Sequence, residues 1–186
     1  MNNKQNRYIA AILSCIMLFS VAFIVLAVSE NIANAKSKVR FLEGDEWRYS
    51  KGMKMPPRKW NHLGFNDANW QRGRSPFGFG ADRLGTSLPD MRRDHSTLLV
   101  RREFTVNPLE IEKIYLSVEC DGSFIAYING IEVARSKTRL TEPINLPGFI
   151  DELLSGKNVL AIECSDDNIN GSRFRFLPLL EIIEKN

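Results

Sequence analysis

Asp166, Asn168 and Asn170 form the stretch whose spacing comes nearest to a metal-binding loop. Their side-chain oxygens occur at alternate positions, and Gly171 follows where a calcium loop turns sharply. In such loops a bidentate glutamate six residues after the glycine is the strongest ligand, but this chain has Leu177 there. The missing ligand favours a polar turn between two strands over a calcium site, and calcium is the one cofactor that the sequence suggests.

The sequence contains no recognisable catalytic pattern. His62 and His95 are the only histidines, and neither has a motif that would supply the partner a general base needs. Nucleophile-elbow, phosphate-loop and dinucleotide-binding motifs do not occur. A carboxylate pair for glycoside hydrolysis could come only from aspartates of no fixed spacing, namely Asp82, Asp90, Asp94 and Asp121. We therefore expect solvated loop carboxylates and a protein that is not an enzyme.

The clearest structural element is a β-hairpin within residues 121–135, DGSFIAYINGIEVAR. Apolar side chains alternate up to the Asn-Gly step at 129–130 and resume after it. Both turn residues tolerate a positive φ, which a two-residue type I′ turn requires. Such a turn predicts two cross-strand pairs, Ile128 with Ile131 and Ala126 with Val133.

Five segments of the chain resemble the galactose-binding-like β-sandwich domains of extracellular bacterial proteins. One is the hairpin at 121–135. The segments 65–70 (FNDANW) and 75–80 (SPFGFG) resemble the F-D-D-S-x-W and P-L-G-Y-G motifs of that family. The segments 98–104 (LLVRREF) and 158–164 (NVLAIEC) resemble two of its strands. The pattern of many short strands separated by turn signals, with little helix, also favours a β-sandwich.

The resemblance implies an all-β fold, a jelly-roll or galactose-binding-like β-sandwich, over almost all of the chain after its N-terminal segment. We expect residues 1–35 to be a signal peptide or membrane anchor, 36–40 a short junction, and 41–186 the sandwich domain. Related modules accompany glycoside hydrolases and other surface proteins. The resemblance specifies a fold more closely than it specifies a function.

The resemblance also suggests where a ligand would bind. In sandwiches of this class that bind sugars, loops at one end or edge of the sheets hold the ligand, and an aromatic face stacks on a sugar ring. The candidates lie in or beside the long polar segment 81–97: Phe77, Asp82, Arg83, Arg92, Asp94 and His95. Phe79 is expected to support this loop from within, as the three tryptophans are expected to support the core.

Cys120 and Cys164 are the only cysteines outside the N-terminal apolar segment. The alternation in their strands points both sulfurs inward, and the resemblance makes the two strands neighbours. A disulfide in an oxidising compartment and two buried free cysteines are both compatible with this pattern. A zinc site is not expected, since the chain has neither C-x-x-C nor a Cys/His cluster.

Residues 9–28 are apolar except for two serines and one cysteine, and they follow Lys4 and Arg7. Twenty such residues can span a bilayer as a helix, whereas Ala33-Asn34-Ala35 is a plausible signal cleavage site. The length favours a transmembrane anchor over a removed signal. Both alternatives place the following domain outside the cytoplasm, anchored to the membrane or secreted.

The charge of the chain is nearly balanced, with a formal value of +3. No basic face or nucleic-acid motif emerges, so nucleic acid is not an expected partner. The leading hypothesis is a module that binds a glycan at the cell surface. The alternative is a structural or protein-interaction domain of an envelope assembly that has no sugar site.

Overall fold

The hairpin forms around a two-residue turn. The computed structural model describes residues 37–52, 56–93, 96–137, 142–168 and 170–185, and it places β8 (Ser123–Ile128) and β9 (Ile131–Ser136) on either side of that turn. Asn129 and Gly130 have φ values of 53° and 93°, so both adopt the left-handed conformation that the sequence predicted.

The predicted pairing of this hairpin is confirmed at the turn and wrong farther from it. Ile128 pairs with Ile131, but Ala126 pairs with Ala134 because the register shifts between Ala126 and Tyr127. Such a shift is a β-bulge, in which one strand has an extra residue. Local alternation does not reveal a bulge, so the sequence placed Val133 opposite Ala126.

The strands form two sheets of six strands each. Sheet A has the order β10-β7-β12-β4-β5, with β1 also paired to β12. Its strands are β1 (Ser37–Phe41), β4 (Phe77–Phe79), β5 (Thr86–Ser87), β7 (Ile111–Cys120), β10 (Ile144–Asn145) and β12 (Phe174–Glu184). Sheet B has the order β3-β2-β6-β11-β8-β9. Its remaining strands are β2 (Glu46–Lys51), β3 (Gln71–Arg74), β6 (Thr97–Val106) and β11 (Gly156–Ser165).

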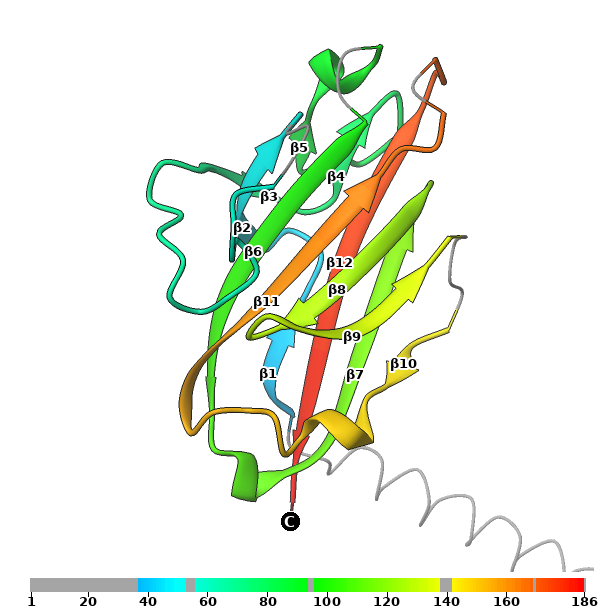
Figure 1. Cartoon of the computed structure of the whole chain (residues 1–186). Coiled ribbons are helices and arrows are strands. Elements are labelled where there is room, and N and C mark those ends of the chain that lie inside the picture. The colour runs from blue at the N-terminus through cyan, green and yellow to red at the C-terminus, as the bar shows by residue number, and fades with distance from the viewer. Residues whose placement is uncertain (1–36, 53–55, 94–95, 138–141, 169, 186) are drawn as a thin grey trace, which may run out of the picture. The chain divides into compact units, whose positions relative to one another are not determined.

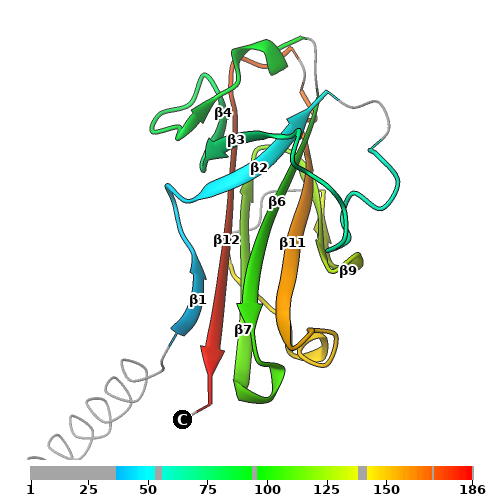
Figure 2. The same ribbon diagram turned by 90° about the vertical axis from the view of Figure 1, so that its left-hand side faces the viewer.

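The two sheets form a β-sandwich with one main hydrophobic core. Alternate residues of β7 and β12, among them Leu116 and Leu180, are buried in this core together with Leu160 and Ile162 of β11. Figure 1 shows the two layers, and Figure 2 shows β1 and β12 on one side and β11 and β9 on the other. The expected all-β fold is confirmed for the described residues, which contain only single-turn helices: η1 (Pro89–Met91), η2 (Pro108–Glu110) and η3 (Pro147–Phe149).

Strand β1 covers residues 37–40 of the segment that the sequence assigned to a short junction and extends to Phe41. Arg40 pairs with Glu181 and Phe41 with Leu180, so sheet A includes these residues. Pro178 lies where β12 has a partner on one side only, since β4 pairs with residues 174–176 and β1 pairs from residue 180 onward. A proline is tolerated at such an edge position, because no neighbouring strand on that side needs its missing N–H donor.

A second, smaller core lies on the outer face of sheet B. Residues 56–70, which follow β2, place Trp60 and Phe65 against this face, where Leu99 and Tyr127 meet them. Arg101 of β6 is only 1% exposed beneath the segment. Its guanidinium donates to Asp67 Oδ2 at 2.9 Å and to the carbonyls of Trp60, His62 (3.0 Å) and Phe65 (3.5 Å).

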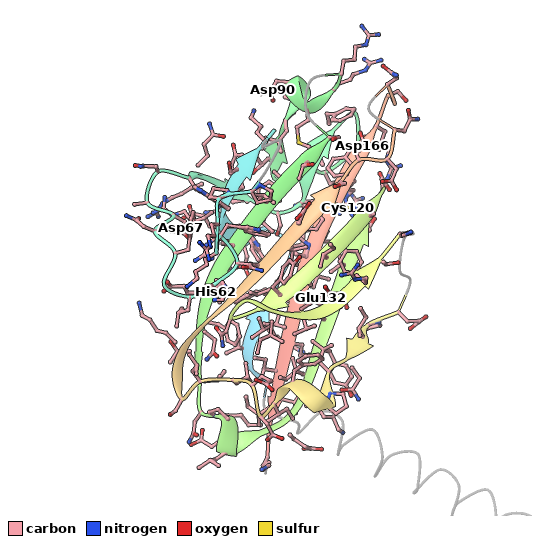
Figure 3. The ribbon with its side chains drawn as sticks, in the orientation of Figure 1. His62, Asp67, Asp90, Cys120, Glu132 and Asp166 are labelled. Carbon is pink, nitrogen blue, oxygen red and sulfur yellow. A yellow bond between two sulfur atoms is a disulfide. The ribbon has the colours of Figure 1, made fainter. Side chains whose placement is uncertain are left out.

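The 56–70 segment also reaches the hairpin turn. A Cβ atom on Gly130 would lie 2.6–2.7 Å from ring atoms of His62, so only glycine fits beneath that imidazole. Figure 3 shows His62 and Asp67 in this segment, at the side of sheet B. His62 is exposed, and its ring lies against the hairpin turn.

No helix in the described part of the chain is long and apolar enough to cross a membrane. The apolar residues 9–28, for which the sequence predicts a transmembrane or signal helix, lie outside the described residues.

Candidate functional site

The aromatic residue that the sequence offered as a sugar platform is not on the surface. Phe77 is completely buried in the main core, where its ring centroid lies 5.4 Å from that of Tyr49 and 6.4 Å from that of Phe176. Its alternation in β4 turns the ring inward, so Phe77 has no face to offer a ligand. Phe79 is 4% exposed and packs near Phe174, in agreement with its expected supporting role.

The structure describes three of the polar residues of the predicted loop site. Asp82, Arg83 and Arg92 are exposed, and no hydrogen bond or ion pair joins any two of these three described residues. Asp94 and His95 lie outside the described residues. Among the described candidates, Phe77 is therefore inaccessible to a ligand, and Asp82, Arg83 and Arg92 are exposed without bonds to one another.

The segment predicted as a half calcium loop forms the turn between β11 and β12. Asp166 is buried, and its Oδ1 accepts a hydrogen bond from the backbone amide of Asn168 at 2.9 Å. Burial raises the pKa of Asp166, and the charges of Asp167 and Asp121 raise it further. Asn168 and Asn170 are exposed. Within the described residues there is no group of three His, Cys, Asp or Glu side chains that could hold a metal ion.

Cys120 of β7 and Cys164 of β11 are joined by a disulfide. Both residues are buried, and the bond links sheet A to sheet B across the main core. The two strands belong to different sheets and face each other across the core, close enough for the bond that the sequence left as one of two alternatives.

A groove lies on the outer face of sheet A and has a volume of about 590 Å³. Tyr115 and Ser117 of β7, together with Leu179 and Glu181 of β12, lie along it, and Pro143 borders it before β10. These residues alternate with buried ones in both strands, so the sandwich geometry points them outward.

The register of sheet A aligns four polar or aromatic residues in one row, and three of them, Arg40, Tyr115 and Glu181, line the groove. Asn145 pairs with Tyr115, Tyr115 with Glu181, and Glu181 with Arg40. Directly opposed residues in antiparallel strands share a face, with Cβ atoms about 5 Å apart. Four strands, β10, β7, β12 and β1, are therefore needed to assemble this row.

The charges beside the groove are paired. Arg40 Nε donates to Glu181 Oε1 at 2.9 Å, and Arg40 Nη2 lies 2.5 Å from the same oxygen. Farther along the face, Arg175 lies 2.5 Å from Glu119 and 3.5 Å from Glu43. The groove thus combines a half-buried tyrosine with a neutralised carboxylate–guanidinium pair.

This arrangement suits a neutral, hydroxyl-rich ligand. The flat ring of Tyr115 can stack on the apolar face of a sugar ring, while Arg40, Glu181 and Ser117 offer both donors and acceptors to hydroxyl groups. The volume lies within the range of small-molecule sites.

The sequence did not single out these groove residues. Positions 40, 115, 145 and 181 are far apart in the chain, and each belongs to a different strand. The one local signal of this site is that Tyr115 occupies an outward-facing position in an alternating strand. Outward tyrosines are also common on ordinary sheet surfaces.

No family model matches this sequence, and no curated protein matches it. Solved structures do resemble the fold, including a Bacteroides uniformis beta-glucuronidase 2 with a TM-score of 0.56 at 20% identity, over 77% of this chain and 18% of that chain. A glycosyl hydrolase family 2 member from Bacteroides cellulosilyticus has a TM-score of 0.54 at 15% identity, over 77% of this chain and 20% of that chain. A Bifidobacterium dentium beta-glucuronidase has a TM-score of 0.52 at 15% identity, over 70% of this chain and 20% of that chain.

The chain thus spans about a fifth of the length of these solved structures. At such low identity the likeness concerns the fold alone. The two-sheet β-sandwich of this protein is therefore similar to a part of large glycoside hydrolases.

Proposed function

We propose that this protein is a non-catalytic, galactose-binding-like module that binds a neutral glycan in the groove of sheet A. The observation that carries the proposal is the row Asn145–Tyr115–Glu181–Arg40, which sets an aromatic ring beside a paired arginine and carboxylate. The fold likeness to parts of enzymes that act on sugars supports a carbohydrate-related role. The sequence resemblance to sugar-binding modules supports it independently.

The test is glycan-array binding by the full chain in mild detergent, followed by titration of the best ligand. Tyr115→Ala should weaken binding at least about tenfold, because it removes the stacking surface. Arg40→Ala should weaken binding less, since Glu181 and Ser117 remain. Leu109→Ala is a matched control on an exposed apolar residue in η2, outside the groove.

The same titration distinguishes the groove from the loop that the sequence favoured. Arg83→Ala and Arg92→Ala should leave affinity unchanged if the ligand occupies the groove. If these loop variants abolish binding while Tyr115→Ala does not, the groove assignment is wrong.

A protein-interaction domain is the second candidate, and exposed leucines favour it. Leu109 is 81% exposed and Leu154 is 50% exposed. Both lie at the end of the sandwich where β6 finishes and β11 begins, since Val106 pairs with Gly156. A folded chain that binds no glycan, together with a purified envelope partner whose binding Leu109→Glu abolishes, would support this alternative.

We further propose that the module lies outside the cytoplasm, held at the membrane by residues 9–28 or released after Ala35. Protease added to intact cells should degrade the domain. N-terminal sequencing of the mature protein distinguishes the two forms, because cleavage after Ala35 makes Lys36 the first residue.

A further inference from the structure

A second depression lies on the outer face of sheet B and has a volume of about 360 Å³. It is lined by Ser123 and Ile125 of β8, Glu163 and Ser165 of β11, Arg135 of β9, and Lys137. The register explains this grouping, because Glu163 pairs with Ile125, Ile125 pairs with Arg135, and Ser165 pairs with Ser123.

Glu163 is the unusual member of this set. It lies near the centre of a six-stranded sheet and is partly buried, and burial raises the pKa of its carboxyl group. Among the described residues its carboxylate has no hydrogen-bond or ion-pair partner.

The neighbouring cations are engaged elsewhere or solvated. Arg135, on the next strand but one, donates both Nε and Nη2 to Glu132. Arg101, on the other side of β11, is held by Asp67. Lys137 is exposed at the rim. Figure 3 shows Glu132 on β9, at the outer edge of the sheet.

A partly desolvated carboxylate without a counter-charge is costly, and a cation that docks against it lowers that cost. Two further acceptors border the depression. Ser123 Oγ donates to Asp167 Oδ1 at 3.1 Å, which leaves its lone pairs free to accept, and Ser165 offers a second hydroxyl.

We propose that this depression binds the primary ammonium group of an amino sugar. An ammonium has three donors, which match the Glu163 carboxylate and the two serine hydroxyls. The volume admits one sugar ring. This site uses none of the groove residues of sheet A, so an experiment can disprove either site without disproving the other.

The test is a titration of the isotopically labelled full chain in detergent with glucosamine, followed by nuclear magnetic resonance. Glucose and N-acetylglucosamine are the matched ligands, since they keep the ring but lack the positive charge. Glucosamine should shift the backbone amides of Ser123, Glu163 and Ser165 and bind at least tenfold more tightly than either neutral sugar. Added salt should weaken this binding.

Glu163→Gln should reduce glucosamine affinity at least tenfold, because it removes the charge and preserves the shape. Glu103→Gln, at a carboxylate of β6 that pairs with Lys157 outside the depression, is the matched control, and Tyr115→Ala should leave glucosamine binding unchanged. The proposal is overturned by equal binding of glucosamine and N-acetylglucosamine, by unchanged affinity in a folded Glu163→Gln protein, or by the absence of saturable glucosamine binding.

Discussion

The two outer faces of the sandwich differ in what covers them. On sheet B, residues 56–70 lie over the strands and bury Arg101, whose donors are satisfied by Asp67 and backbone carbonyls. On sheet A, Arg40 makes a comparable pair with Glu181, but the two side chains remain 57% and 37% exposed.

This difference separates residues that hold the fold from residues that are available to a ligand. A buried arginine contributes to folding because its partners would otherwise lack hydrogen bonds. An exposed ion pair contributes little, since water competes for both ions. The groove of sheet A can therefore change its chemistry at small cost in stability, whereas the covered part of sheet B cannot.

The disulfide joins the two sheets through the core, and its loss should be the largest of the effects considered. Replacing Cys120 and Cys164 with alanine frees a loop of sequence separation 44, and the chain-entropy description puts the loss in unfolding free energy at about 4 kcal/mol. Urea unfolding measures this loss. If the double variant unfolds at the same urea concentration as the parent protein, the disulfide does not stabilise the sandwich.

Arg101→Ala should lower the free energy of unfolding by about 3 kcal/mol, because Asp67 and the carbonyls of Trp60 and His62 lose their donor. Arg40→Ala on the open face should cost less than about 1 kcal/mol. Urea unfolding of both variants under one condition makes the comparison. Similar losses would mean that the covering segment does not distinguish the two faces.

Two tyrosines give a finer version of the same test. Tyr127 packs edge-on against Trp60 with ring centroids 5.9 Å apart, so Tyr127→Ala should cost about 2 kcal/mol. Tyr115 lies along the open groove, so Tyr115→Ala should cost less than about 1 kcal/mol. A larger loss for Tyr115→Ala in thermal unfolding would make that tyrosine a core residue and count against its role in binding.

The smallest effect concerns Glu163 and pH. Because burial raises the pKa of this carboxyl in the folded protein, the folded state holds its proton more strongly than the unfolded state does. Stability should therefore fall as pH rises from the ordinary glutamate pKa through the raised value. Glu163→Gln should raise the free energy of unfolding by at most about 0.5 kcal/mol at about pH 7, because the carboxyl group is partly solvated. At about pH 4 the substitution should leave the free energy of unfolding unchanged.

Urea midpoints at both pH values check this expectation. Asp166 has a pKa shift in the same direction, so some pH dependence should persist in the variant. A Glu163→Gln protein that is less stable than the parent at neutral pH would show that the carboxylate has a favourable partner.

Much of the fold could be predicted from local sequence. The Asn-Gly step at 129–130 requires positive φ at both residues, which determines the turn type and the first cross-strand pair. Period-two alternation in β7 predicts which residues face the core, because successive side chains of a strand point to opposite faces. The tryptophans at 47 and 60 are buried as expected, since large aromatic rings contribute most to small β cores.

The candidate site depended on tertiary structure. Local pattern does not decide that Phe77 turns inward, nor that Arg40, Tyr115 and Glu181 stand in one row. Register between strands far apart in the chain is set by the packing of the whole sandwich, and a shift of one residue would turn each of these side chains to the other face. The sequence by itself thus determined the turns and the alternating strands, whereas the tertiary structure decided which outward residues meet, because only cross-strand register brings distant positions together.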